Sequence, residues 1–213
     1  MNFNSLLSNA LKLIEMIPRQ VKGSQSSTCY KVSSGRSLEA SIIYNRARES
    51  LLNVNDWHRV AGGGARFQLV NEMGEKLHAM AKQDDFIRIS IPNVPGPSDG
   101  DGFEWVRVEN IEEKWTSDMS SIAMSVRPAV PPIPQKKHIA HFFTDEATST
   151  FYLERSGKSV KAAVFGRNEK PNIGHAGWLD AIRNLIVSVA AILGFNKPQW
   201  KKFVTGLLKK SAF

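Results

Sequence analysis

The stretch Phe151-Tyr-Leu-Glu-Arg-Ser-Gly-Lys-Ser-Val-Lys-Ala-Ala-Val164 decides the fold class. Apolar residues alternate with polar or small ones on both sides of Ser156-Gly157-Lys158, which has the composition of a turn. The alternating apolar positions are Phe151, Leu153, Val160, Ala162 and Val164. A period of two is that of a strand with one face in the core, so this stretch predicts an antiparallel hairpin.

The same period recurs in the middle of the chain, at residues 65–69, 87–91, 103–108 and 122–126. Segments rich in proline and glycine separate the strand patterns. We therefore expect seven to nine short strands over residues 55–168, in an antiparallel β-barrel or a strongly curled sheet.

Helical periodicity flanks this central region. Residues 1–17 and 37–53 each place apolar residues at helical spacing, and residues 178–210 predict two helices joined by a short turn, a C-terminal αα-hairpin. Residues 18–36 contain many serines and two glycines, which predicts a mobile linker. The expectation is one α+β domain over residues 1–213, with N-terminal helices and the C-terminal hairpin packed on the β core.

Composition is ordinary except for the charge. The chain has 213 residues, of which 42% are hydrophobic and 23% charged, which argues against a disordered or fibrous protein. The net charge of +8 is uneven, because residues 136–213 carry 13 Lys and Arg against 5 Asp and Glu, whereas residues 61–135 carry 7 against 11. Residues 1–60 carry 8 against 4, so the basic excess lies at the two ends of the chain and the central strands are acidic.

Cysteine content and hydropathy limit the class of protein. The single Cys29 excludes an intramolecular disulfide and a cysteine-based zinc site. The N-terminus lacks the basic region of a secretory signal, and the most apolar run is too short to span a bilayer. We expect a cytoplasmic protein with no transmembrane segment. His138 and His141 are expected to point to opposite faces of a strand, so no metal site and no cofactor are predicted.

The last predicted helix is the first candidate site. It and the turn before it carry lysines beside an apolar face, at Lys197, Lys201, Lys202, Lys209 and Lys210. Such a helix suits an anionic polymer, a membrane surface or an acidic protein. Sequence-specific DNA binding is not expected, because the helix offers few side chains that read bases. Solvated lysines on a helix that only covers the sheet are the alternative.

A polar pocket at the mouth of the β core is the second candidate. His141, Glu169 and His175 are the candidate catalytic residues, because imidazole and carboxylate groups perform acid–base chemistry. The candidate ligand-binding residues, which lie at predicted strand ends, are Arg127, Arg167 and Asn168. These residues would act together only if the sheet curls enough to bring their side chains around one cavity.

Three function classes stay open at this point. The sequence favours a non-enzymatic binding module that uses the basic C-terminal helix, and it leaves an enzyme or small-ligand binder as the alternative. The third class is an assembly or scaffold protein that docks through its N-terminal helix, with a homo-oligomer as one outcome.

Overall fold

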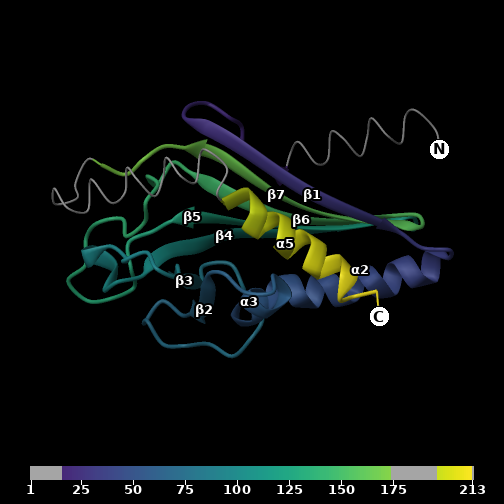
Figure 1. The fold of residues 1–213 in the computed structure, drawn as a ribbon, viewed down its shortest axis with the longest axis horizontal. Coiled ribbons are helices and arrows are strands. Elements are labelled where there is room, and N and C mark those ends of the chain that lie inside the picture. The colour runs from purple at the N-terminus through teal and green to yellow at the C-terminus, as the bar shows by residue number, and fades with distance from the viewer. Residues whose placement is uncertain (1–15, 174–195, 213) are drawn as a thin grey trace.

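The computed structural model describes residues 16–173 and 196–212. Its strands form one sheet, in which all neighbouring pairs are antiparallel and the order is β1-β7-β6-β5-β4-β3-β2 (Figure 1). The strands are β1 (Ser24–Ser33), β2 (Arg66–Val70), β3 (Phe86–Ser90), β4 (Glu104–Trp115), β5 (Met119–Pro128), β6 (Thr148–Ser156) and β7 (Ser159–Glu169). The predicted α+β class with an antiparallel sheet is confirmed.

The sheet does not close, so the barrel alternative is wrong. Among the described residues β1 pairs only with β7, and β2 pairs only with β3. Residues of both edge strands nevertheless line one cavity, Thr28 from β1 and Phe67 from β2, so the sheet curls strongly. The helix α5 (Asn196–Lys209) occupies the space between the two edges, because its Lys201 Nζ donates to the carbonyl of Cys29 at 2.8 Å and its Gln199 packs against Gly64.

The described helices cover one face of the sheet. α2 (Ser37–Leu52) packs on β6 and β7, while α5 packs on β1 and β7. The short helices η1 (Val54–Asp56) and α3 (Trp57–Val60) lie against β2, and α3 also touches α5 (Figure 1). A further short turn, η2 (Ser98–Gly100), precedes β4. No helix in the described part of the chain is long and apolar enough to cross a membrane.

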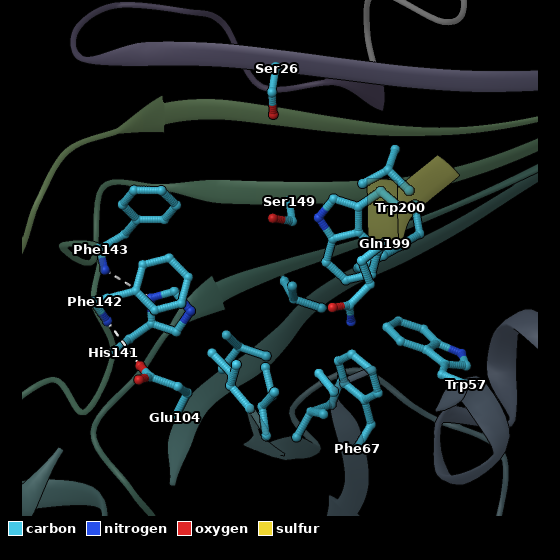
Figure 2. Close-up of a pocket in the computed structure, with 18 of the residues that line it drawn as sticks. Ser26, Trp57, Phe67, Glu104, His141, Phe142, Phe143, Ser149, Gln199 and Trp200 are labelled. Atoms are coloured by element: carbon cyan, nitrogen blue, oxygen red, sulfur yellow. Dashed lines mark hydrogen bonds between the residues drawn. The ribbon is translucent and has the colours of Figure 1, made fainter. Parts of the chain in front are cut away.

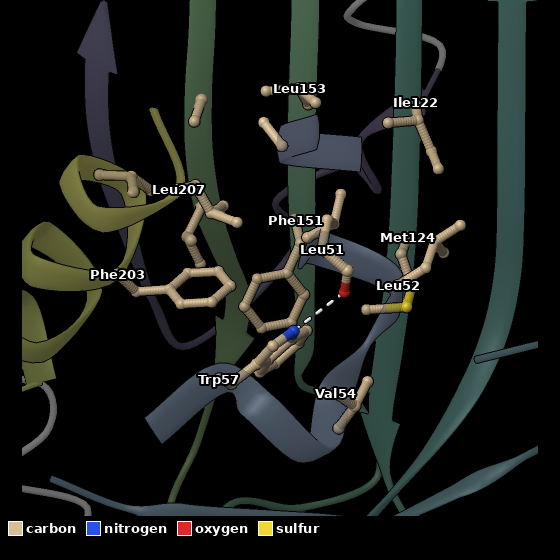
Figure 3. Close-up of a cluster of buried hydrophobic side chains, with 14 of the residues drawn as sticks. Leu51, Leu52, Val54, Trp57, Ile122, Met124, Phe151, Leu153, Phe203 and Leu207 are labelled. Carbon is tan, nitrogen blue, oxygen red and sulfur yellow. Dashed lines mark hydrogen bonds between the residues drawn. The ribbon is translucent and has the colours of Figure 1, made fainter. Parts of the chain in front are cut away.

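The main core lies between these helices and the sheet, and Trp57 is at its centre. The Trp57 ring is 4.5 Å from Phe151 and 4.8 Å from Phe203, centroid to centroid, and its Nε1 donates to the carbonyl of Leu51 at 2.9 Å (Figure 3). The Trp57 side chain therefore contacts β6, α5 and the end of α2. The indole N–H is satisfied, as burial of a tryptophan requires.

The Ser-rich segment corrects one prediction. Residues 24–33 are not a mobile linker but the edge strand β1, in which exposed and half-buried residues alternate. Tyr30 and Val32 face the core, opposite Ala162 and Val160 of β7. The inward positions before them are serine and threonine, so the hydrophobic signal of a strand is missing there. Backbone pairing with β7 orders the segment despite its polar composition.

The predicted helices agree with the structure where it describes them. α2 begins at the predicted residue and ends one residue before the end of the predicted range 37–53. α5 lies in the second half of the predicted hairpin. Most of the N-terminal helix, residues 1–15, and the first helix of the hairpin, residues 178–193, lie outside the described residues.

Tyr44 on α2 gives a first testable prediction. Its hydroxyl is buried and has no hydrogen-bond partner among the described residues, and burial together with the nearby Glu113 carboxylate raises its pKa above the usual value of 10.0. The unfolded chain releases this proton at lower pH than the folded protein, so the unfolding free energy falls as the pH rises above about 10. Tyr44→Phe is expected to weaken that fall and to leave stability at pH 7 unchanged or higher.

Urea unfolding of both proteins at several pH values between about 7 and 11 measures this effect. Part of the pH dependence of the unfolding free energy should persist in Tyr44→Phe, because burial and the hydrogen bond to Glu154 also raise the pKa of Tyr152. Identical pH slopes for Tyr44→Phe and the unmodified protein would contradict the prediction.

Candidate functional site

A cavity of about 100 Å³ lies between the curled sheet and the start of α5. Side chains from all of the strands β1 to β7, from α3 and from α5 line it (Figure 2). One wall is aromatic and is formed by Trp57, Phe67, Phe151 and Trp200. The Trp200 ring is 5.2 Å from Phe151 and 6.3 Å from Phe67, so these rings form a continuous surface beneath the helix.

The opposite wall combines aromatic rings with acid–base groups. Glu104, at the start of β4, is only 1% exposed, and its Oε2 accepts the backbone N–H of Phe142 at 2.9 Å. His141 is also buried and stacks on Phe142 with 4.2 Å between ring centroids. Its Nδ1 accepts the backbone N–H of Phe143 at 3.0 Å, so a neutral ring carries its proton on Nε2 and can donate there. Figure 2 shows Glu104 and His141 side by side at this wall.

A third side of the cavity is polar and comes from the two paired strands β1 and β7. Ser26 donates to Oε1 of Glu169 at 3.0 Å, and Ser24 donates to its Oε2 at 3.3 Å. The carboxylate lies over Gly166, where an added Cβ would be 2.0 Å from Oε1. The glycine therefore leaves the space that lets Glu169 fold back along its own strand toward the cavity.

The structure brings together only part of the pocket expected from the sequence. His141 and Glu169 line the same cavity, whereas Arg127 pairs with Glu109 at 2.5 Å outside it. Arg167 donates to the carbonyls of Ser26 and Gly166 and so joins β1 to β7. Catalytic roles for His141 and Glu169 stay predictions.

The side chain of Asn168 binds backbone groups of the N-terminal segment instead of lining the cavity. Its side-chain oxygen accepts the N–H groups of Val21 and Lys22, and its amide nitrogen donates to the carbonyl of Arg19. It therefore holds the chain that leads into β1. His175, the remaining candidate, lies outside the described residues.

The lysines of the C-terminal helix divide into two groups. Lys201 donates to Cys29 and lies over the ring of Tyr30, and Lys210 donates to the carbonyl of Arg59. Lys202 and Lys209 are exposed. The side chain of Lys197 lies outside the described residues. Lys201 and Lys210 are exposed as well, and anion binding by these lysines stays a prediction.

Several cavity residues escaped the sequence analysis, above all Glu104. It shares the inward face of β4 with Val106, and an ionisable residue at an inward strand position is the signal that could have identified it. Ser26 and Thr28 were missed together with their strand. In the described part of the chain, no three His, Cys, Asp or Glu side chains are grouped closely enough to hold a metal ion.

Comparison with known proteins adds similarity of fold only. No protein-family model and no curated protein matches the sequence. Among solved structures, the chain is similar to a hypothetical protein from Helicobacter pylori, with 11% identity, 88% of each chain covered and a TM-score of 0.46. It is also similar to truncated norcoclaurine synthase from Thalictrum flavum, with 10% identity over 91% of this chain and 97% of the other, at a TM-score of 0.42.

An aromatase/cyclase from a Streptomyces species is similar at 6% identity, over 88% of this chain and 94% of the other, with a TM-score of 0.41. At these identities and TM-scores, a shared function does not follow from a similar chain path. What this site binds has to follow from its own side chains.

Proposed function

We propose that this protein binds a small aromatic molecule carrying a hydrogen-bonding group, in the cavity beneath α5. The observation that supports this most is the combination of an aromatic wall with Glu104 and His141, two buried polar side chains, at the other end of the same cavity. Ligand sites are typically apolar with a few polar groups that fix orientation. Engineered apolar cavities of about 150 Å³ bind benzene, so a cavity of about 100 Å³ limits the ligand to no more than a single small ring.

The polar groups favour a ligand that can donate a hydrogen bond. Glu104 and Glu169 offer carboxyl oxygens, and Ser149 adds a hydroxyl at the edge of the cavity. Phenol and benzene differ only in such a donor. We expect phenol to bind about tenfold more tightly than benzene, because a hydrogen bond to a charged group contributes about 1.5–3 kcal/mol.

Acid–base catalysis on the bound ligand is the second candidate function. It is favoured by the position of His141 beside Glu104 at the wall of a mainly apolar cavity. Binding through the basic helix is less favoured than either, because Lys201 and Lys210 already donate to backbone carbonyls of this chain.

Filling the cavity tests the binding proposal. Val126 is buried on β5 and lines the cavity, so Val126→Phe is expected to weaken phenol binding by at least about tenfold, because the new ring occupies the ligand's space. Calorimetric titration of phenol into each protein measures the dissociation constant. Tryptophan fluorescence provides a second signal, since Trp57 and Trp200 border the cavity.

Val21→Phe is the matched control, because the same substitution is then made at an exposed side chain. It should bind phenol as the unmodified protein does. The proposal is refuted if the unmodified protein shows no saturable phenol binding, or if folded Val126→Phe binds phenol equally well.

A further inference from the structure

A second hollow, of about 390 Å³, lies on the outer side of β2 and β3, away from the cavity beneath α5. Its lining comes from α3 with η1, from β2 and β3, and from the turn before β4. The lining residues that carry its chemistry are Asn55, His58, Arg66, Gln68, Arg88 and Ser90. Its size lies within the range of small-molecule sites.

Two guanidinium groups share this hollow. In the β2–β3 ladder Arg66 is opposite Ser90 and Gln68 is opposite Arg88, which makes the two arginines diagonal neighbours on one face. Diagonal neighbours are about 7 Å apart at their backbones, so both long side chains can reach a single ion. Two like charges held this close favour an anion between them.

Within the described part of the chain, no carboxylate pairs with either of these two arginines. Several other arginines pair with carboxylates, namely Arg36, Arg48, Arg59, Arg107 and Arg127. Neither Arg66 nor Arg88 forms an ion pair within residues 16–173 and 196–212, and no aspartate or glutamate is among the described residues that line the hollow. This occurs in the part of the chain whose net charge is negative, so general basicity does not explain it.

Arg88 is also held in position. Its guanidinium carbon lies 4.3 Å from the centroid of the Phe103 ring, a cation–π contact that fixes the plane of the guanidinium. A planar guanidinium presents paired N–H groups to two oxygens of one anion. His58 from α3 and the hydroxyl of Ser90, which is opposite Arg66 in the ladder, line the same hollow and add further donors for an oxyanion.

We propose that Arg66, Arg88 and His58 bind the phosphate group of a small phosphorylated molecule. The hollow is larger than a phosphate ion needs, which leaves room for an organic part beside the polar side chains of Gln68 and Asn55. The site is independent of the cavity beneath α5, since the β2–β3 ladder lies between them and, of the described residues, only Phe67 borders both.

Calorimetric titration with phenyl phosphate and with inorganic phosphate, at constant ionic strength, tests this site. We expect saturable binding of both, and Arg66→Gln and Arg88→Gln should each weaken it by about tenfold or more. Arg88→Lys should weaken phenyl phosphate binding less than Arg88→Gln, because it retains the charge but not the paired N–H groups. Arg36→Gln is the matched control, since it removes the same charge from a side chain that is 83% exposed, and it should bind within about twofold of the unmodified protein.

Two results would overturn the proposal. One is the absence of saturable binding of either phosphate compound, and the other is equal weakening by Arg36→Gln and the two site variants. A further experiment measures binding to vesicles that contain phosphatidic acid. Binding to these vesicles without binding to phenyl phosphate would overturn the assignment to a small molecule. Phenol binding should be unchanged in Arg66→Gln, which separates this site from the proposed cavity function.

Discussion

Replacing Trp57 by alanine is expected to lower the unfolding free energy by about 3–5 kcal/mol. Trp57 is 1% exposed and contacts the rings of Phe67, Phe151 and Phe203, which come from β2, β6 and α5. Its removal leaves a large space among groups that are held by three separate elements and cannot all close around it. The carbonyl of Leu51 also loses the indole donor.

Equilibrium unfolding in urea measures this loss, and Trp115→Ala provides the control. Trp115 is 63% exposed at the end of β4, so its truncation should change stability by less than about 0.5 kcal/mol. Similar losses for the two variants would contradict the central position of Trp57. Trp57→Phe should cost less than alanine, because it retains a ring and loses mainly the hydrogen bond.

Gly206→Ala in α5 is expected to destabilise the protein by about 1–3 kcal/mol, although the same change in an exposed helix stabilises it by about 1 kcal/mol. The reason is close contact with α3, since a Cβ on Gly206 would lie 2.0 Å from the carbonyl oxygen of Val60. That oxygen belongs to the backbone and cannot rotate away. The helix would have to move outward, and Trp200 and Gln199 of the same helix line the cavity.

The sign of the Gly206→Ala effect is therefore decisive. A gain in unfolding free energy would show that α5 does not cross α3 at this distance. Lys202→Ala, an exposed change in the same helix, should alter stability by less than about 0.5 kcal/mol. Phenol titration of the folded Gly206→Ala protein adds a second measurement, in which weaker binding is expected because the helix that covers the cavity has shifted.

Much of the fold could be predicted where periodicity was strong. The hairpin around Gly157 and the helix α2 agree with the predictions because their buried positions are apolar and repeat with the period of a strand or a helix. β1 was missed for the opposite reason, since Ser24, Ser26 and Thr28 occupy its inward positions. Those polar residues face Glu169 and the cavity instead of the packed core, so no apolar alternation marked this part of the segment as a strand.

The candidate site was predictable only in fragments. His141 and Glu169 were selected for their chemistry and do line one cavity, yet Arg127 and Arg167, chosen by the same reasoning, are occupied with Glu109 and with backbone carbonyls. Whether a charged side chain faces a ligand or a neighbouring strand depends on partners that are distant in sequence. Composition and spacing carry no information about such partners.

By itself, the sequence determined the α+β class, the antiparallel pairing of neighbouring strand patterns and the uneven charge, because these depend on local periodicity and composition. The tertiary structure decided that the sheet curls without closing, that α5 fills the gap between its edges, and that Glu104 and His141 meet at one wall. It also placed Arg66 beside Arg88, with no carboxylate among the described residues that line their hollow. These outcomes depend on contacts between residues far apart in the chain, which form only when the whole sheet curls around its core.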